Sequence, residues 1–315
     1  MARIIDLDKE NSTESIDKSA IALGNFDGFH LGHRNIIKKA IDIAKEKDIK
    51  SSVLIFKQHT NEVFPQFERR YLNSLKDKIE TLEKLGMDYI FIKDFSEEFA
   101  KLNRDQFMLD FIVGQLKANS IVCGRDYTFG KKDDANVSHI LQYEKDMLLD
   151  AYIVDDYLYK GSKLSSTLIR DMIKSGEVKE ASTLLGDKYT VKGQVVHGKK
   201  IGSKELGYPT ANLDLDFPYV LPAEGVYLTN IYINSNRYLS LTSIGTNPTV
   251  TDSKDIKVEV FILDFNEKIY GSKVKVEFID WIRGQIKFDS KEELIKQMDQ
   301  DLDFALKYKV NNLQN

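Results

Sequence analysis

The spacing of the apolar residues changes about half-way along this 315-residue chain, and that change constrains the fold more than any other feature. In the first half, short apolar runs alternate with stretches in which apolar residues recur every three or four positions. The runs are Ala20–Gly24, Ser52–Phe56, Tyr89–Ile92, Ser120–Gly124 and Ala151–Val154. Strands that alternate with helices in this way predict a Rossmann-like α/β domain with a parallel sheet.

The stretches between these runs have the period of amphipathic helices. Their apolar residues are Ile36, Ile37, Ala40, Ile41 and Ala44 in one stretch, Leu75, Ile79, Leu82 and Leu85 in another, and Phe107, Met108, Phe111, Ile112 and Leu116 in a third. Each set falls on one face of a helix with about 3.6 residues per turn. Gly86 follows the second set and predicts the end of that helix.

The second half of the chain contains strands that follow closely on one another. The runs are Thr190–Val196, Val226–Ile233, Tyr238–Ile244, Val258–Leu263 and Lys273–Ile279, and turn residues separate them. This pattern predicts a small antiparallel β-barrel. Ser290 and Glu293 form a capping-box sequence before one closing helix, which we expect to pack against the barrel. The predicted domains are residues 1–186 and residues 187–315.

Charge, cysteine content and hydropathy exclude several classes of protein. The formal net charge is −4, so no domain-wide basic field favours a nucleic acid as a partner. Cys123 is the only cysteine, which excludes an intramolecular disulfide and a cysteine-based zinc site. We expect it to be a buried strand residue and not a nucleophile. No stretch approaches the roughly 18 apolar residues of a membrane span, so we expect a cytoplasmic protein without a membrane partner. The sequence leaves self-association of protomers open.

A glycine-rich segment with two histidines follows the first predicted strand. It reads Gly24-Asn25-Phe26-Asp27-Gly28-Phe29-His30-Leu31-Gly32-His33. In a parallel α/β sheet, ligands bind at the carboxyl ends of the strands, and the N-terminus of the following helix attracts phosphate. His30 and His33 are three positions apart, so both can donate to one phosphate group, and Gly32 leaves room for a nucleotide. The alternatives are a glycine-rich turn with incidental histidines, or a zinc site that lacks convincing further ligands.

Two segments of the second half also carry polar groups within apolar surroundings. Glu259 interrupts an apolar strand, where a carboxylate is costly to bury without a role or a partner. The alternative is that Glu259 lies on a solvated face of its strand. The segment from Gly193 to Lys200 nearly matches a phosphate-binding loop, but Lys200 stands where that loop needs Ser or Thr. We therefore reject a phosphate-binding loop at that position.

The histidine segment resembles the HxGH signature of the nucleotidyltransferase superfamily, in the form that bacterial FAD synthetases use. The companion motif of that family, ISSTxIR, is similar to Leu164-Ser165-Ser166-Thr167-Leu168-Ile169-Arg170. The segment Cys123–Gly130 is similar to the family's glycine–aromatic loop. In the second half, Gly207-Tyr208-Pro209-Thr210-Ala211-Asn212-Leu213 resembles the PTAN motif of riboflavin kinases. From about Ile21 to about Asp301, the chain therefore resembles the bifunctional riboflavin kinase/FMN adenylyltransferase family.

This resemblance implies two reactions and a role for each motif. The second domain would phosphorylate riboflavin with ATP to FMN, with Glu259 as general base, and the first would join AMP from a second ATP to FMN, giving FAD and pyrophosphate. His30, His33 and Arg170 would stabilise the adenylyl transfer. The implied ATP contacts in the first domain are Gly24, Asn25, Phe26, Asp27, His30, Gly32, His33, Ser165, Ser166, Thr167 and Arg170, and the implied flavin contacts are Asp126, Tyr127 and Phe129. The implied ATP and phosphate contacts in the kinase domain are Gly198, Lys204, Gly207, Thr210 and Asn212, of which Thr210 and Asn212 would hold Mg²⁺ through hard oxygen atoms.

The chain departs from the family pattern after the second predicted strand. Lys57-Gln58-His59-Thr60 replaces a Pro-His-Pro segment there, and the sequence does not determine how this affects adenylyl transfer. One alternative is a kinase with a degenerate first domain. A second is a flavin-binding regulator without turnover, which predicts loss of Glu259 or of the two histidines. A third is a class I tRNA synthetase, which shares the HxGH signature but predicts an anticodon-binding domain and a basic surface.

Overall fold

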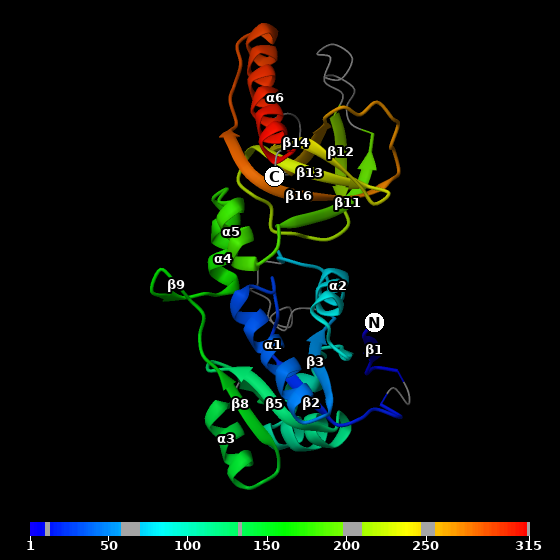
Figure 1. The fold of residues 1–315 in the computed structure, drawn as a ribbon, viewed down its shortest axis with the longest axis vertical. Helices are drawn as coiled ribbons and strands as arrows, with labels where there is room; N and C mark the ends of the chain where they lie inside the picture. The colour runs from blue at the N-terminus through cyan, green and yellow to red at the C-terminus, as the bar shows by residue number, and fades with distance from the viewer. Residues whose placement is uncertain (10–12, 58–69, 132–133, 198–209, 247–255, 314–315) are drawn as a thin grey trace. The chain divides into compact units, whose positions relative to one another are not determined.

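The computed structural model describes residues 1–9, 13–57, 70–131, 134–197, 210–246 and 256–313. The chain forms two compact units, Met1–Ser166 and Thr167–Asn315. Figure 1 traces their elements from the blue N-terminus to the red C-terminus. Within the described ranges, no helix combines the length and the apolarity that crossing a membrane requires.

Six parallel strands form the sheet of the first unit, in the order β1-β4-β3-β2-β5-β8. Their bounds are β1 Arg3–Asp6, β2 Ser19–Leu23, β3 Lys50–Phe56, β4 Tyr89–Lys93, β5 Ala118–Gly124 and β8 Asp150–Val154. Five of them coincide with the predicted runs, so the predicted parallel α/β domain is confirmed. The edge strand β1 was not expected from the sequence, because its four residues are of mixed polarity.

Helices cover both faces of this sheet. On one face, α1 (Leu31–Glu46) and α2 (Leu75–Leu85) pack against alternate strand residues that include Ala22, Val53 and Ile90. On the other face, η3 (Gln106–Gln115) and α3 (Val137–Lys145) pack against strand residues that include Ile21, Leu54 and Phe91. These residues alternate with the first set because successive side chains point to opposite faces of a strand. Gly86 ends α2 in the left-handed conformation, with a φ of 88°, as predicted. The third predicted helix, η3, is a π-helix and not an α-helix.

The strand order reverses between β2 and β5, and this places the motifs of the first unit. From β2 the chain adds β3 and β4 on one side, whereas β5 and β8 lie on the other side. Ligands bind at such a switch point, beyond the carboxyl ends of the strands. The histidine turn follows β2, and the loop that begins at Gly124 follows β5. Two short hairpins lie in the same unit, β6 (Thr128–Phe129) with β7 (Ala135–Asn136), and β9 (Leu158–Tyr159) with β10 (Ser162–Lys163).

The second unit contains a closed antiparallel barrel and, among the described residues, three helices. The helices α4 (Ser166–Lys174) and α5 (Val178–Leu185) precede the barrel, whose strand order is β11-β12-β15-β14-β13-β16. The strand bounds are β11 Thr190–Val196, β12 Thr210–Leu215, β13 Gly225–Ile233, β14 Asn236–Thr246, β15 Ile256–Ile262 and β16 Lys273–Gly284. β11 pairs with both β12 and β16, which closes the barrel. The predicted barrel is confirmed, and β12, which holds Thr210, Ala211 and Asn212 of the PTAN-like motif, is a strand that was not predicted.

The closing helix α6 (Lys291–Leu313) packs on the outer face of the barrel, as expected. Its Ala305 is buried against barrel residues that include Leu228, Leu241 and Ile279. The Ser290 hydroxyl accepts from the Glu293 N–H at 3.2 Å, which caps the helix start. The same helix contributes Leu294, Met298 and Asp301 to the lining of a cavity on this outer face.

Two candidate active sites

The histidine segment folds into a strained turn between β2 and α1. The φ angles are 47° at Phe26, 84° at Gly28 and 46° at Phe29. A bulky residue rarely adopts a positive φ, and such strain is concentrated at functional sites. The two phenylalanine rings are fully buried and stack with their centroids 5.7 Å apart, so core packing holds the turn in place. A Cβ at Gly24 would lie 3.1 Å from the Phe26 ring, which explains the glycine there.

Side chains and backbone groups from residues 72–78 anchor the same turn. The bonds are Lys78 Nζ to the Asn25 carbonyl at 3.2 Å, Leu72 N to Asp27 Oδ1 at 3.3 Å, and Gly28 N to Asn73 Oδ1 at 3.2 Å. Asp27 is also buried. Asn25 and Asp27 thus help to hold the shape of the turn, and ATP binding by them stays a prediction.

The companion motif contacts the histidine turn within the first unit. Ser166 Oγ donates to the Asp27 carbonyl at 2.9 Å. Ser166 begins α4, and Arg170 lies one turn further along the same helix face. Ser165 precedes this helix, and Thr167 is its second residue. The two motifs therefore meet at Ser166, and their joint role in ATP binding stays a prediction.

His30 and His33 lie with their rings stacked, their centroids 3.8 Å apart and their planes 18° apart. Burial lowers the pKa of His30 to about 4. Burial also holds the pKa of His33 well below its usual value, and the neighbouring His30, Lys78 and Lys163 lower it further. Both imidazoles are therefore neutral near neutral pH. His30 Nδ1 accepts from the His33 N–H at 3.4 Å, so the neutral ring carries its proton on Nε2.

Gly32 allows the histidine pair and the segment before α4 to come together. A Cβ at Gly32 would lie 3.2 Å from the His30 ring and 3.6 Å from the Tyr157 Cβ. The Tyr157 carbonyl accepts from Leu164 N at 2.8 Å. Strands β9 and β10 lie between these two residues, so the hairpin begins and ends close to the histidines. The space next to Gly32 is thus filled by protein side chains, and its contact with ATP stays a prediction.

Lys163 supplies a positive charge beside the neutral histidines, although no motif in the sequence includes it. Its Nζ donates to Asp126 at 2.6 Å and to Asp156 at 2.8 Å. Burial by itself lowers the pKa of Lys163, but these two bonds outweigh it and raise the pKa. The lysine therefore stays protonated. The only signal in the sequence was its place three residues before Ser166.

The three residues with an implied flavin contact have different surroundings. The Asp126 side chain is largely exposed and bonds to Lys163, and Tyr127 is half-buried. The Phe129 ring is buried in the core, 5.7 Å from the ring of Phe107. Cys123 is buried in β5 as predicted, and burial raises the pKa of its thiol to about 12. A direct contact between the flavin and any of these side chains stays a prediction.

The unusual Lys57 is held by the unpredicted strand β1 and the residues after it. Its Nζ lies 2.9 Å from Asp6 Oδ1 and 2.8 Å from Asp8 Oδ2. Asp8 also pairs with Lys93 and accepts from Asp94 N at 2.8 Å. These contacts fix the lysine at the carboxyl end of β3. Gln58, His59 and Thr60 lie outside the described residues.

In the barrel, the strand register brings the predicted kinase residues together. Glu259 on β15 pairs directly with Asn212 on β12 and with Ser243 on β14. Thr210 lies on the same face as Asn212, because the two are two positions apart on one strand. The intervening residues Val258 and Val260 are buried in the barrel, so Glu259 lies on the outer face. Glu259 is half-buried there, so it is neither fully buried among apolar residues nor fully solvated, which were the two alternatives that the sequence left open.

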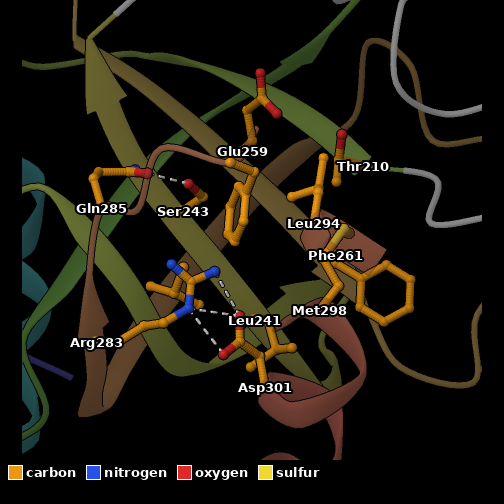
Figure 2. Close-up of a pocket in the computed structure, with 12 residues that line it drawn as sticks. Thr210, Leu241, Ser243, Glu259, Phe261, Arg283, Gln285, Leu294, Met298 and Asp301 are labelled. Atoms are coloured by element: carbon orange, nitrogen blue, oxygen red, sulfur yellow. Dashed lines mark hydrogen bonds and ion pairs between the residues drawn. The ribbon is translucent and has the colours of Figure 1, made fainter. Parts of the chain in front are cut away.

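A cavity of about 250 Å³ opens beside Glu259 on this outer face (Figure 2). Its lining residues are Thr210, Val226, Leu241, Ser243, Glu259, Phe261, Arg283, Gln285, Phe288, Leu294, Met298 and Asp301. Figure 2 shows the oxygen atoms of Glu259 and Thr210 at one end of the cavity, away from Arg283 and Asp301. The cavity thus joins an apolar interior to a carboxylate and a hydroxyl at its mouth. Pockets of this kind bind a largely apolar ligand and orient it through a few polar groups.

The ion pair of Arg283 with Asp301 forms the other end of the cavity. Arg283 Nε lies 3.0 Å from both carboxylate oxygens of Asp301, and Arg283 Nη2 lies 2.7 Å from Asp301 Oδ2. Gln297 Nε2 also donates to Asp301 at 3.0 Å. Asp301 is buried and comes from α6, whereas Arg283 comes from β16. The sequence gives no signal for this pairing, because the two residues are far apart in the chain.

Several predicted kinase residues cannot be placed in this geometry. Gly198, Lys204 and Gly207 lie outside the described residues. Among the described residues, no group of three or more His, Cys, Asp or Glu side chains could hold a metal ion. The Thr210 hydroxyl and the Asn212 amide are nevertheless hard oxygen donors on one strand face, and such donors suit Mg²⁺ together with ATP phosphates.

Comparisons with known proteins identify both halves of the chain. The family model described as FAD synthetase matches residues 12–168, and the model described as riboflavin kinase matches residues 185–309. The bifunctional riboflavin kinase/FMN adenylyltransferase of Listeria monocytogenes is 38% identical over 283 residues, which cover 89% of each chain. The chain belongs to this family. The family member from Bacillus subtilis is 35% identical over 298 residues, 93% of each chain.

A solved structure has the same fold as this family member over nearly its whole length. It is described as a macrolide-efflux protein from Streptococcus pneumoniae, and it matches with a TM-score of 0.87 at 32% identity, covering 96% of this chain and 98% of that one. The two family models leave residues 169–184 between them, and the compact units divide after Ser166. The expected domain boundary after residue 186 stays a prediction.

Proposed function

We propose that the two units act in succession on one flavin. The barrel phosphorylates riboflavin at the cavity beside Glu259, and the parallel-sheet unit then adenylylates FMN at the histidine turn. Members of this family are riboflavin kinases and FMN adenylyltransferases that use ATP, riboflavin and FMN, and this chain is one of them. The observation that carries the assignment of the sites is the position of Glu259, at the mouth of an apolar cavity and directly opposite Asn212.

In the kinase step, the Glu259 carboxylate takes the proton of the riboflavin 5′-hydroxyl. The oxygen then attacks the γ-phosphorus of ATP, and ADP leaves with the electrons of the broken bond. The apolar part of the cavity encloses the flavin ring, and the ion pair of Arg283 with Asp301 offers N–H donors to the polar edge of that ring. Because about 250 Å³ is less than the roughly 300–1,000 Å³ of most pockets for whole ligands, the side chain of the flavin extends to the mouth.

Thr210 and Asn212 would hold Mg²⁺ near Glu259, where the ion would help to bind the ATP phosphates. Their oxygen atoms match the ligand preference of this ion, which neutralises phosphate charge when it is bound. The residues of the protein itself orient the two substrates and exclude water from the reacting oxygen. Gly198, Lys204 and Gly207 are further phosphate contacts in this proposal.

In the adenylyl transfer, an oxygen of the FMN phosphate attacks the α-phosphorus of ATP, and pyrophosphate leaves. The charge that develops on the phosphates needs donors that are already in position. His30 and His33 serve as neutral N–H donors, since their pKa values are too low for a charge. Lys163 and Arg170 supply the positive charge, and no covalent intermediate with the enzyme is needed.

Two further observations support the histidine turn as the site of this transfer. Nδ1 of His33 is buried and makes no hydrogen bond with the described residues, whereas buried polar atoms are normally paired. The positive φ angles of Phe26 and Phe29 also show backbone strain in this turn, and such strain is concentrated at functional sites. In this proposal, the backbone of Gly24–His33 and the residues Ser165, Ser166 and Thr167 bind ATP, and Asp126, Tyr127 and Phe129 border the flavin.

Chromatography of the flavins formed from riboflavin, ATP and Mg²⁺ tests both assignments at once. We expect the wild type to give FMN and then FAD. Glu259→Gln should give neither product from riboflavin, yet it should still convert added FMN to FAD. His33→Gln should show the opposite pattern, in which FMN accumulates and FAD does not form.

Each of three other outcomes would contradict part of this proposal. If the wild type stopped at FMN, the first unit would be degenerate. If the wild type bound flavin without turnover, the chain would be a regulator. If Glu259→Gln retained kinase activity, the cavity beside Glu259 would not be the site of phosphoryl transfer.

A further inference from the structure

Two uncharged polar side chains lie at the mouth of the kinase cavity and have no role in the chemistry described above. Ser243 is on β14, directly opposite Glu259 in the antiparallel register, and Gln285 follows β16. Both line the cavity. Gln285 Nε2 donates to Ser243 Oγ at 3.3 Å and to the Ile244 carbonyl at 2.8 Å (Figure 2).

The hydrogen bonds of this pair leave the Ser243 proton available to a ligand. A serine hydroxyl has one proton and two lone pairs, and here one lone pair accepts from Gln285. The Gln285 amide is fixed by its second bond to the Ile244 carbonyl, so its N–H stays directed at one lone pair of the hydroxyl. A Cβ at Gly245 would lie 2.8 Å from Gln285 Nε2, which shows that this glycine leaves the space that the amide occupies.

The position of Ser243 relative to Glu259 determines which ligand atoms it can meet. Residues directly opposite in an antiparallel pair have Cβ atoms about 4.5–5.5 Å apart. A flavin whose terminal hydroxyl lies at Glu259 places the inner hydroxyls of its side chain beside the neighbouring strand. The ring itself lies deeper, among Leu241, Phe261 and Met298.

We infer that Ser243, held by Gln285, recognises the inner hydroxyls of the ribityl chain and so selects flavins that carry a polyol. This inference rests on the proposed assignment of the cavity to riboflavin. Ser243 is the specificity-determining residue, since its hydroxyl touches the substrate. Gln285 is a positioning residue that acts through Ser243.

The selection arises because a site that hydrogen-bonds a hydroxyl discriminates against the analogue that lacks it. The matched analogue is a flavin with an unbranched 5-hydroxypentyl chain at N10, which keeps the terminal hydroxyl and lacks the inner ones. One neutral hydrogen bond changes the discrimination by about 5- to 10-fold. The quantity of interest is the ratio of kcat/KM for riboflavin to that for the analogue.

The experiment measures this ratio for the full-length wild type, Ser243→Ala, Ser243→Thr and Gln285→Met. We expect Ser243→Ala to lower the ratio about 5- to 10-fold, through KM for riboflavin, while kcat/KM for the analogue stays unchanged. Ser243→Thr keeps a hydroxyl and should keep the ratio, and Gln285→Met should lower it to a smaller extent. Ser272→Ala, in the same barrel but outside the cavity lining, is the matched control.

Two outcomes would overturn the inference. Equal losses for both flavins in Ser243→Ala would mean that Ser243 supports Glu259 or the fold, and not the ribityl chain. An unchanged ratio would mean that the side-chain hydroxyls lie elsewhere. Denaturant unfolding followed by the fluorescence of Trp281 on β16 reports on the folding of the barrel in these variants, and loss of kinase activity in Glu259→Gln tests the cavity assignment separately.

Discussion

Lowering the pH should destabilise the first unit before it protonates His30 in the folded chain. The unfolded histidine binds a proton near its ordinary pKa of 6.5, whereas the folded ring stays neutral until about 4. Between these values the unfolded state binds more protons than the folded state. The free energy of unfolding therefore falls as the pH falls through this window, and no such contribution exists above it.

The size of the effect follows from the interval between the two pKa values. It corresponds to a loss of about 3 kcal/mol from His30 at the acid end of the window. The pKa of His33 is lowered in the same direction, so its contribution has the same sign. The cause is the burial of the His30 ring, which is only 6% exposed.

Two measurements on the full-length chain check this prediction. NMR titration of the five histidines, assigned with His30→Asn and His33→Asn, gives the folded pKa directly. Hydrogen exchange of the sheet amides follows the stability of the first unit, because the only tryptophan, Trp281, lies in the barrel. We expect His30→Asn to reduce the pH dependence by about 3 kcal/mol. A His30 that titrates near 6.5, or a variant with the wild-type pH dependence, would refute the assignment of neutral histidines.

The other predictions concern charge, an ion pair and the aromatic loop. Lys163→Gln should slow FAD formation from FMN about 100-fold and leave the kinase step unchanged, since it removes a charge that stabilises the transferring group; equal activity would contradict this role. Asp301→Asn leaves the Arg283 guanidinium without its partner, and it should destabilise the barrel by about 3 kcal/mol in denaturant unfolding followed by tryptophan fluorescence. Tyr127→Ala should raise KM for FMN with little loss of stability, whereas Phe129→Ala should cost the first unit about 3–5 kcal/mol. The reverse order of these two effects would place Phe129 at the flavin.

Local patterns were enough to predict most of the elements. The left-handed Gly86 ends α2 where expected, because a glycine after the last apolar position is a local signal. The edge strand β1 was missed, since its four residues RIID have no two-residue period and gain their place only by pairing with β4. The π-helix η3 was read as an ordinary helix because its apolar residues satisfy the three-to-four spacing equally well.

The sequence by itself determined which chemical groups are present and which motifs carry them. Two histidines in a glycine-rich turn, a serine-rich helix start and a carboxylate within an apolar strand could all be found by reading along the chain. The residue types predicted phosphate binding at the histidine turn, the resemblance of the motifs implied the two reactions, and the family comparisons agree with both reactions.

Only the tertiary structure decided the charge states and the partners of these groups. The histidines are neutral because the fold buries them, and burial depends on residues throughout the first unit. Lys163 meets Asp126, Arg283 meets Asp301, and Ser243 meets Gln285 across separations that no local pattern encodes. The physical reason is that solvation and hydrogen bonding depend on distance in space, which the chain fixes only after its strands and helices have packed.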